Sequence, residues 1–255
     1  MLEIRNLSAG YSGRPVLQNI CFNAPSGQIT ALLGPNGCGK STLLRALCGI
    51  LPIQAGDVRL DGISLPVMSP SRQAQHVSFL PQERPMPDCT VRRLALHGRF
   101  PYLSYPRRYR PEDYAAAERA MEQADILSLA DMPISHLSGG QRQKAYIAMA
   151  LAQDTPVMLL DEPTAFLDVS HQLQLLRLAR RLADSGRHIL MVIHDLSHAL
   201  QTADQIVLMD SGRVVMQADP ETLFLSGELD RVFSIRLRRF PADGCWQYVC
   251  KEDIP

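Results

Sequence analysis

The chain has 255 residues, enough for one large domain or two small ones. Lys+Arg and Asp+Glu number 26 each, and the resulting formal charge of zero argues against a broad basic surface for DNA or RNA. The sequence has no apolar run of about 18 residues and no basic-then-apolar start, so we expect a cytoplasmic protein without a signal peptide or a membrane span. Six scattered cysteines without a Cys-x-x-Cys pair predict reduced thiols.

Strand and helix patterns alternate along the chain. Strands are predicted at residues 2–7, 16–22 (entered through a Ser12–Gly13 turn), 28–33, 55–60, 76–80, 157–160 and 189–193. Helical spacing of apolar residues predicts helices over 40–50, 112–130, 138–152, 171–183 and 196–202. A hairpin is expected over 205–217, and two further strands between 233 and 249. This alternation predicts an α/β fold with a largely parallel sheet, into which the mostly helical segment 83–152 is inserted.

A glycine-rich loop lies between the strand 28–33 and the helix that follows it. Its sequence, Gly34-Pro-Asn-Gly-Cys-Gly-Lys-Ser-Thr42, matches the P-loop (Walker A) pattern G-x-x-x-x-G-K-[ST]. Its glycines allow backbone N–H groups to surround phosphate, and the helix dipole favours the same anion. A plain turn before a helix is the alternative. The residues expected to bind nucleotide are Gly34, Pro35, Asn36, Gly37, Cys38, Gly39, Lys40, Ser41 and Thr42, with Lys40 on the phosphates and Ser41 on Mg²⁺.

An apolar strand that ends in two acids follows at Val157–Glu162. It resembles a Walker B strand, which delivers its acids to the crevice where open α/β sheets bind ligands. We expect Asp161 to hold Mg²⁺ and Glu162 to polarise the attacking water. Taken alone, the pair is equally compatible with a helix N-cap.

The segment Leu137-Ser-Gly-Gly-Gln141 favours a nucleotide site over a plain turn or a helix cap. It is the signature sequence of ATP-binding cassette (ABC) ATPases, and the chain resembles the nucleotide-binding subunit of an ABC transporter over about residues 1–225. The resemblance implies a P-loop NTPase core with an N-terminal antiparallel β region. It also implies a head-to-tail dimer, in which ATP lies between the P-loop of one copy and Ser138, Gly139, Gly140 and Gln141 of the other.

Other residues match family motifs in the expected order. Gln82 matches the Q-loop glutamine, which senses Mg²⁺ and links the core to the helical subdomain. Asp168 matches the D-loop at the dimer interface, His194 matches the switch histidine at the γ-phosphate, and Tyr11 stands where the family places the aromatic that stacks on adenine. We expect Lys40, Glu162 and His194 to be catalytic. A metal pair of His194 with His198 is not expected, because His194 should end a strand.

The cargo is indicated by resemblance alone. The segments Leu94–Tyr102 and Gln141–Gln172, including Phe166 and His171-Gln172, resemble cassettes of importers for iron–siderophore, haem and vitamin B12. Import of molybdate or another oxyanion, and a soluble ATPase outside transport, are the alternatives. The basic and aromatic stretch 99–110 is either a solvated loop or part of a groove for a permease helix.

The resemblance therefore implies a single ABC ATPase domain with Mg²⁺ and ATP as cofactors. Residues 1–82 and 153–225 would form the nucleotide-binding core, 83–152 the helical subdomain and 226–255 a C-terminal extension. The implied partners are a second copy, integral membrane permease subunits and, indirectly, a substrate-binding protein, with no nucleic acid. The implied location is the cytoplasmic, inner face of the cell membrane.

Overall fold

The computed structural model describes residues 1–11, 14–165, 167–242 and 244–252. The predicted turn at Ser12–Gly13 and the residue Phe166 lie outside the described residues.

A six-stranded sheet forms the centre of the molecule, with the strand order β10-β9-β3-β8-β7-β6. All neighbours from β9 to β6 are parallel, and β10 pairs antiparallel with β9. β3, β7 and β8 are buried at every position, as their continuous apolar runs predict. The strands are β3 (Ile29–Leu33), β6 (Val77–Leu80), β7 (Val157–Leu160), β8 (His188–Val192), β9 (Gln205–Asp210) and β10 (Arg213–Ala218).

A second, antiparallel sheet confirms the expected N-terminal β region. Its strand order is β2-β1-β4-β5, and its buried face packs with helix α1 (Lys40–Leu47) against one face of the central sheet. The strands are β1 (Leu2–Tyr11), β2 (Arg14–Ala24), β4 (Ile53–Leu60) and β5 (Ile63–Ser64).

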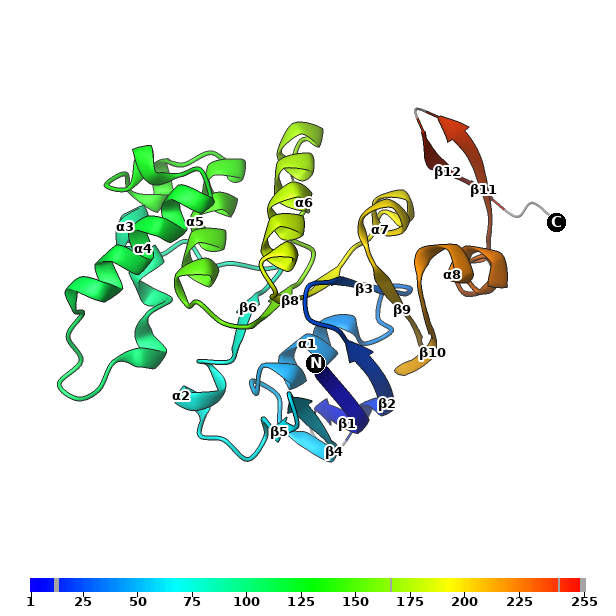
Figure 1. Cartoon of the computed structure of the whole chain (residues 1–255), viewed down its shortest axis with the longest axis horizontal. Coiled ribbons are helices and arrows are strands. Elements are labelled where there is room, and N and C mark those ends of the chain that lie inside the picture. Colours follow the sequence, from blue (N-terminus) through cyan, green and yellow to red (C-terminus); the bar gives the residue numbers. More distant parts are fainter. Residues whose placement is uncertain (12–13, 166, 243, 253–255) are drawn as a thin grey trace.

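Helices fill the chain between β6 and β7 and lie to one side of the sheets (Figure 1). They are α3 (Val91–His97), α4 (Pro111–Gln123) and α5 (Gly139–Ala152), with 3₁₀ turns at Phe100–Tyr102, Leu127–Leu129 and Ile134–His136; α2 (Pro70–Gln73) precedes β6. The remaining elements are α6 (Val169–Asp184), α7 (Leu196–Thr202), α8 (Pro220–Ser226), α9 (Glu228–Phe233) and the hairpin β11 (Ile235–Ala242) with β12 (Cys245–Glu252).

Several predicted boundaries are wrong, each for a local reason. The helix predicted over 40–50 ends at Leu47, because Gly49 adopts a positive φ of 77°, and Ile50 is left 65% exposed. The helix predicted over 112–130 ends at Gln123, since Asp125 has a φ of 53°. Helix α3 was not predicted, because proline and arginine dominate the stretch around it.

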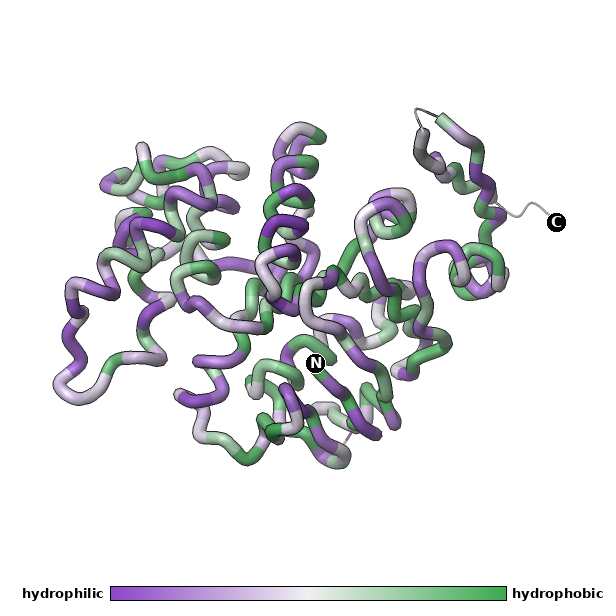
Figure 2. Tube along the Cα trace, viewed as in Figure 1, coloured by the Kyte–Doolittle hydropathy of each residue, from purple (hydrophilic) through white to green (hydrophobic). Residues whose placement is uncertain are grey.

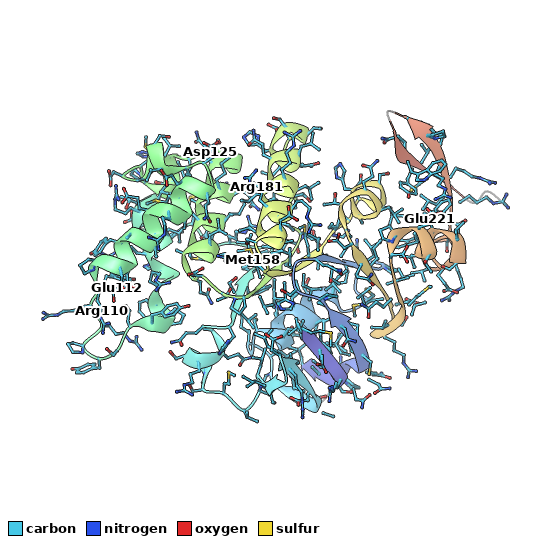
Figure 3. All side chains as sticks on the ribbon, in the orientation of Figure 1. Arg110, Glu112, Asp125, Met158, Arg181 and Glu221 are labelled. Carbon is cyan, nitrogen blue, oxygen red and sulfur yellow. The ribbon has the colours of Figure 1, made fainter. Side chains whose placement is uncertain are left out.

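Apolar side chains from the helical segment and the central sheet belong to one buried cluster. Figure 2 shows hydrophobic residues gathered along the central strands, whereas the loop leading into α4 is largely hydrophilic. In Figure 3, Met158 lies at the centre, and Arg110 and Glu112 lie at the outer end of α4. No helix in the described part of the chain is long and apolar enough to cross a membrane.

One titratable side chain is buried where the two sheets meet. His188, at the start of β8, is 3% exposed, and its Nδ1 lies 2.9 Å from the backbone oxygen of Ala24, to which it donates. Burial lowers the pKa of the His188 imidazole; the nearby N-terminal ammonium of Met1 acts in the same direction, and Asp61 opposes it.

The folded protein should therefore lose stability as the pH falls below about 6.5, where an unfolded histidine gains its proton. The unfolded chain binds that proton more readily than the folded one, so acid favours unfolding. Thermal unfolding between about pH 7 and pH 5.5 measures this loss. The variant His188→Gln should lose less over the same interval. An equal loss in both proteins would contradict this role of His188.

Candidate functional site

The glycine-rich loop joins β3 directly to α1 and folds around its own lysine. Lys40 is 6% exposed, and its Nζ donates to the backbone oxygens of Gly34 at 2.6 Å and Pro35 at 3.0 Å. The N-cap residue of α1 is Gly39, which has no side chain. No side-chain hydrogen bond therefore caps the first N–H groups of the helix. The loop thus combines a positive charge with uncapped helix amides, which suits an anion.

A hydroxyl and a carboxylate meet beside this loop. Ser41 Oγ donates to Asp161 Oδ1 at 3.1 Å, and Asp161 stands directly after β7 with 2% exposure. Burial raises the pKa of the Asp161 carboxyl, and the charge of Glu162 acts in the same direction. A hydroxyl and a carboxylate are the hard oxygen ligands that Mg²⁺ prefers, so this pair fits the expected metal.

Glu162 is held from two sides. Gln82 Nε2, from the segment after β6, donates to Glu162 Oε2 at 2.5 Å. His194 Nε2, from the segment after β8, lies 2.5 Å from Glu162 Oε1. Glu162 itself has a φ of 47°, a left-handed conformation that costs energy outside glycine. Three strand ends therefore converge on one carboxylate.

Most of these groups surround one open cavity of about 520 Å³, although Asp161 itself does not line it. The lining residues are Val16, Asn36, Gly37, Gly39, Lys40, Ser41, Thr42, Gln82, Glu162 and His194. Val16, on β2, was missed, because a single apolar residue in a strand carries no signal for a ligand. Cys38 is 4% exposed and does not line the cavity. Burial raises the pKa of its thiol.

The signature residues Ser138–Gln141 do not reach this cavity. Ser138 caps α5: its Oγ accepts from the Gln141 N–H, and the Gln141 side chain accepts from the Ser138 N–H. Gly139 instead lines a second cavity of about 620 Å³, which shares Gln82 and Glu162 with the first. Gly140 packs beside the ring of His171 on α6.

Two other candidates also lie apart from the P-loop cavity. Asp168 caps α6 by accepting from the His171 N–H at 2.9 Å, and its carboxylate also contacts His171 Nδ1 at 2.8 Å. Tyr11, at the end of β1, is 43% exposed and does not line the cavity; its hydroxyl accepts from Arg45 Nη1 at 3.4 Å. His194 precedes α7, whereas His198 lies within it.

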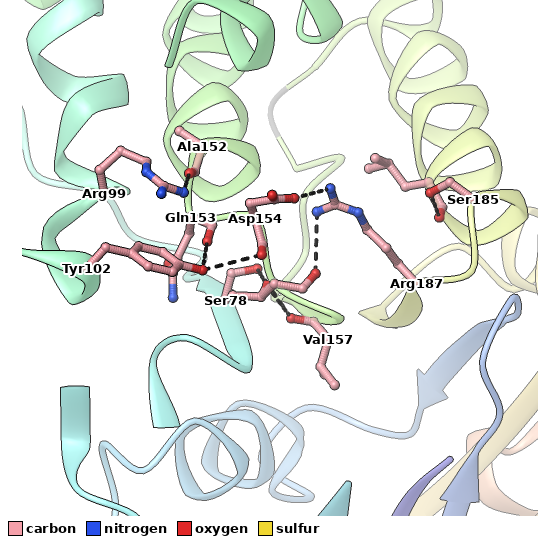
Figure 4. Close-up of polar contacts among 11 residues, drawn as sticks. Ser78, Arg99, Tyr102, Ala152, Gln153, Asp154, Val157, Ser185 and Arg187 are labelled. Atoms are coloured by element: carbon pink, nitrogen blue, oxygen red, sulfur yellow. Dashed lines mark hydrogen bonds and ion pairs between the residues drawn. The ribbon is translucent and has the colours of Figure 1, made fainter. Parts of the chain in front are cut away.

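The basic stretch 99–110 is only partly a surface loop. Its first residues neither face solvent as a loop nor stand free to receive a permease helix, as the two expectations had it. Arg99 forms a nearly buried ion pair with Asp113 at 3.0 Å and donates to the backbone oxygen of Ala152. Tyr102 Oη donates to the backbone oxygen of Gln153 at 2.9 Å (Figure 4). Arg99 and Tyr102 therefore hold the end of α5, a packing role.

The outer part of the stretch does face solvent. Tyr105 is 96% exposed and Arg108 is also exposed, while the guanidinium of Arg107 lies 5.0 Å from the ring centroid of Phe100.

Known proteins are similar to this chain in sequence and in structure. A family model described as ABC transporter matches residues 17–165. The chain is 40% identical over 237 residues to the ferric enterobactin transport ATP-binding protein FepC of Escherichia coli (strain K12), covering 92% of this chain and 88% of that protein. It is 43% identical over 221 residues to the hemin import ATP-binding protein HmuV of Nocardia farcinica (strain IFM 10152), covering 86% and 76%.

One solved structure, an ABC transporter of metal-chelate type in an inward-facing conformation, has a chain similar to this one over nearly its full length. The TM-score is 0.84 at 26% identity, and the match covers 99% of this chain and 98% of that chain.

Gly34 should be irreplaceable in the loop. A Cβ there would lie 2.2 Å from the backbone oxygen of Met209 on β9, and its φ is 152°. We expect Gly34→Ala to lower ATP affinity at least tenfold, since the neighbouring backbone cannot move without disturbing the sheet. Gly62→Ala, outside the loop, is the control: its φ is 83° but nothing lies within 4 Å, so only backbone strain of about 1–2 kcal/mol is added. Equal affinities in the two variants, measured by calorimetry, would contradict the steric argument.

Proposed function

The chain belongs to the ABC transporter family, and from this premise we propose that it is the ATP-hydrolysing subunit of an importer for an iron–siderophore, haem, vitamin B12 or related metal chelate. The observation that carries the ATPase assignment is the convergence of Lys40, Ser41 and Glu162 on one cavity. The cargo class is supported by relatives whose names specify enterobactin and hemin. Neither of these two relatives is named for an oxyanion or for a role outside transport.

The phosphates of ATP would lie in the loop 34–39, against its amides and the N-terminus of α1. Lys40, now held by two loop carbonyls, would turn its ammonium to the phosphate oxygens. Ser41, Asp161 and Gln82 would hold Mg²⁺, which supplies charge neutralisation on the phosphates.

Glu162 would act as the general base. Its carboxylate can accept a proton from the attacking water once Gln82 turns away from Oε2. His194, on the other oxygen, would orient the carboxylate and reach the γ-phosphate. Tyr11 would stack on adenine, a contact worth about 1 kcal/mol.

The second half of the site would come from another copy of the chain. Ser138, Gly139, Gly140 and Gln141 stand at the N-terminus of α5, an anion-binding position that is outside the P-loop cavity of the same chain. Asp168 is the N-cap residue of α6, and its carboxylate contacts His171, whose ring lies beside Gly140. A head-to-tail pair would bring these residues onto the partner's ATP.

The chain would dock on a permease at the inner face of the membrane and respond indirectly to a substrate-binding protein. We assign residues 1–82 and 153–225 to the nucleotide-binding core, 83–152 to the helical subdomain and 226–255 to a C-terminal extension. The exposed part of the stretch 99–110, which follows the Q-loop segment and α3 in the chain, is our candidate for the permease contact.

Replacing Glu162 by Gln should leave ATP binding intact and lower turnover by about 10²–10⁴-fold, because an amide cannot accept the proton. Dimers holding two ATP should accumulate, as seen by gel filtration. The neighbouring Glu83→Gln should keep normal phosphate release, and Lys40→Ala should weaken binding and turnover together. Normal turnover in Glu162→Gln would remove Glu162 from the role of base.

The double variant Arg107→Glu/Arg108→Glu should bind ATP normally but lose most co-purification with the permease and most chelate uptake. Arginine at an interface contributes through charge and stacking, so reversing two charges should be strongly unfavourable. Arg177→Glu/Arg181→Glu, two exposed arginines on α6, is the control with the same charge change. Full complex formation and normal uptake in the first variant would show that the stretch is a solvated loop without a permease contact.

A further inference from the structure

The turn between β9 and β10 lies against the glycine-rich loop. It consists of Ser211 and Gly212, whose φ angles of 48° and 76° are those of a two-residue hairpin turn. The Gly212 N–H donates to the backbone oxygen of Cys38 at 3.0 Å. The turn is therefore bonded directly to the loop that we propose for the phosphates of ATP.

The same turn is also bonded to strand β2. The Gln18 N–H donates to the backbone oxygen of Gly212 at 2.9 Å, and Arg213 Nη2 donates to Gln18 Oε1 at 2.9 Å. Further along β10, the Gln217 side chain donates to the backbone oxygen of Asn23 at 2.7 Å and accepts from the Asn23 N–H at 3.2 Å. β10 thus runs beside β2 (Figure 1), and its turn joins this strand to the glycine-rich loop.

Strand β2 forms a wall of the P-loop cavity. Val16 lines that cavity together with Gly39 of the loop. The next residue packs on the same glycine, since a Cβ at Gly39 would lie 2.8 Å from Leu17 Cδ2. β2 pairs with β1, which ends at Tyr11, our candidate for the adenine contact. The loop and β2 are therefore two walls of one cavity, the first for the phosphates and the second towards the nucleoside.

Gly212 leaves no space for a side chain on the side of β2. A Cβ there would lie 2.0 Å from the backbone oxygen of Val16 and 3.1 Å from the carbonyl carbon of the same residue. The three atoms nearest to such a Cβ all belong to β2, and none belongs to the glycine-rich loop. A methyl group at this position would therefore displace β2 relative to the loop.

We propose that Gly212 is a positioning residue, which sets the spacing between the phosphate loop and the strand that faces the nucleoside. It acts through its backbone bonds to Cys38 and Gln18 and does not itself line the cavity. The proposal rests on the proposed function, in which one ATP molecule contacts both walls.

ATP and inorganic tripolyphosphate distinguish the two walls, because tripolyphosphate has the phosphates without the nucleoside. The wild-type chain should bind ATP more tightly than tripolyphosphate in calorimetry. Gly212→Ala should lower the affinity for ATP about tenfold, the size of one lost base contact, and change that for tripolyphosphate less than about threefold. Gly34→Ala, whose added Cβ meets β9 beneath the loop, should weaken the binding of both ligands.

Gly62→Ala is the matched control. Gly62 lies in the two-residue turn between β4 and β5, where Asp61 and Gly62 have φ angles of 50° and 83°, and nothing lies within 4 Å of an added Cβ. This variant should bind both ligands as the wild type does, although its melting temperature falls. Arg213→Met keeps Gly212 and removes only the side-chain bond to Gln18. It should lower the affinity for ATP alone by about two- to threefold, and it decides the question if Gly212→Ala does not fold.

An unchanged preference for ATP over tripolyphosphate in Gly212→Ala and in Arg213→Met would overturn the proposal. An equal loss of both ligands in Gly212→Ala would overturn it as well, because the defect would then lie in the loop and not in the spacing. A wild-type chain that binds ATP no better than tripolyphosphate would show that no second wall contacts the nucleoside, with the same consequence. A wild-type chain that binds ATP without hydrolysing it would instead contradict the proposed function.

Discussion

The parallel pairing of β3, β8, β7 and β6 is the constraint on which the rest of the structure depends. It brings the carboxyl ends of four strands to one edge, so the glycine-rich loop, His194, the acids Asp161 and Glu162, and Gln82 meet although they are far apart in sequence. Burial on both faces keeps these strands mostly apolar, with Thr30 and Ser78 among the buried exceptions, and the charged groups of the site therefore stand at the strand ends. The antiparallel sheet and α1 pack together against one face of the central sheet.

A second consequence is that one chain carries two separate cavities, which we propose are halves of two different ATP sites. The P-loop cavity and the cavity at the start of α5 share Gln82 and Glu162 but no other lining residue. Glu162 has both carboxylate oxygens engaged, by Gln82 and His194, so a single chain holds the carboxylate that we propose as the base in a closed arrangement. A second copy would supply the anion-binding helix end that the P-loop cavity of one chain lacks.

The sequence allowed much of this site to be predicted, because the P-loop, the strand 157–160 and the segment 137–141 are short patterns whose own glycines, apolar residues and cap determine their geometry. Predictions failed where a role depends on distant partners. Arg99 and Tyr102 looked like surface residues, because a basic and aromatic stretch has the same composition whether it faces water or packs on α5. Val16 and helix α3 gave no local signal.

The central claim is that hydrolysis needs two copies of the chain, and a dilution series tests it most directly. The rate of phosphate release per subunit should fall towards zero as the protein is diluted, in step with the loss of dimer seen by sedimentation in the presence of ATP. An undiminished rate per subunit from a chain that sediments as a monomer would contradict the account.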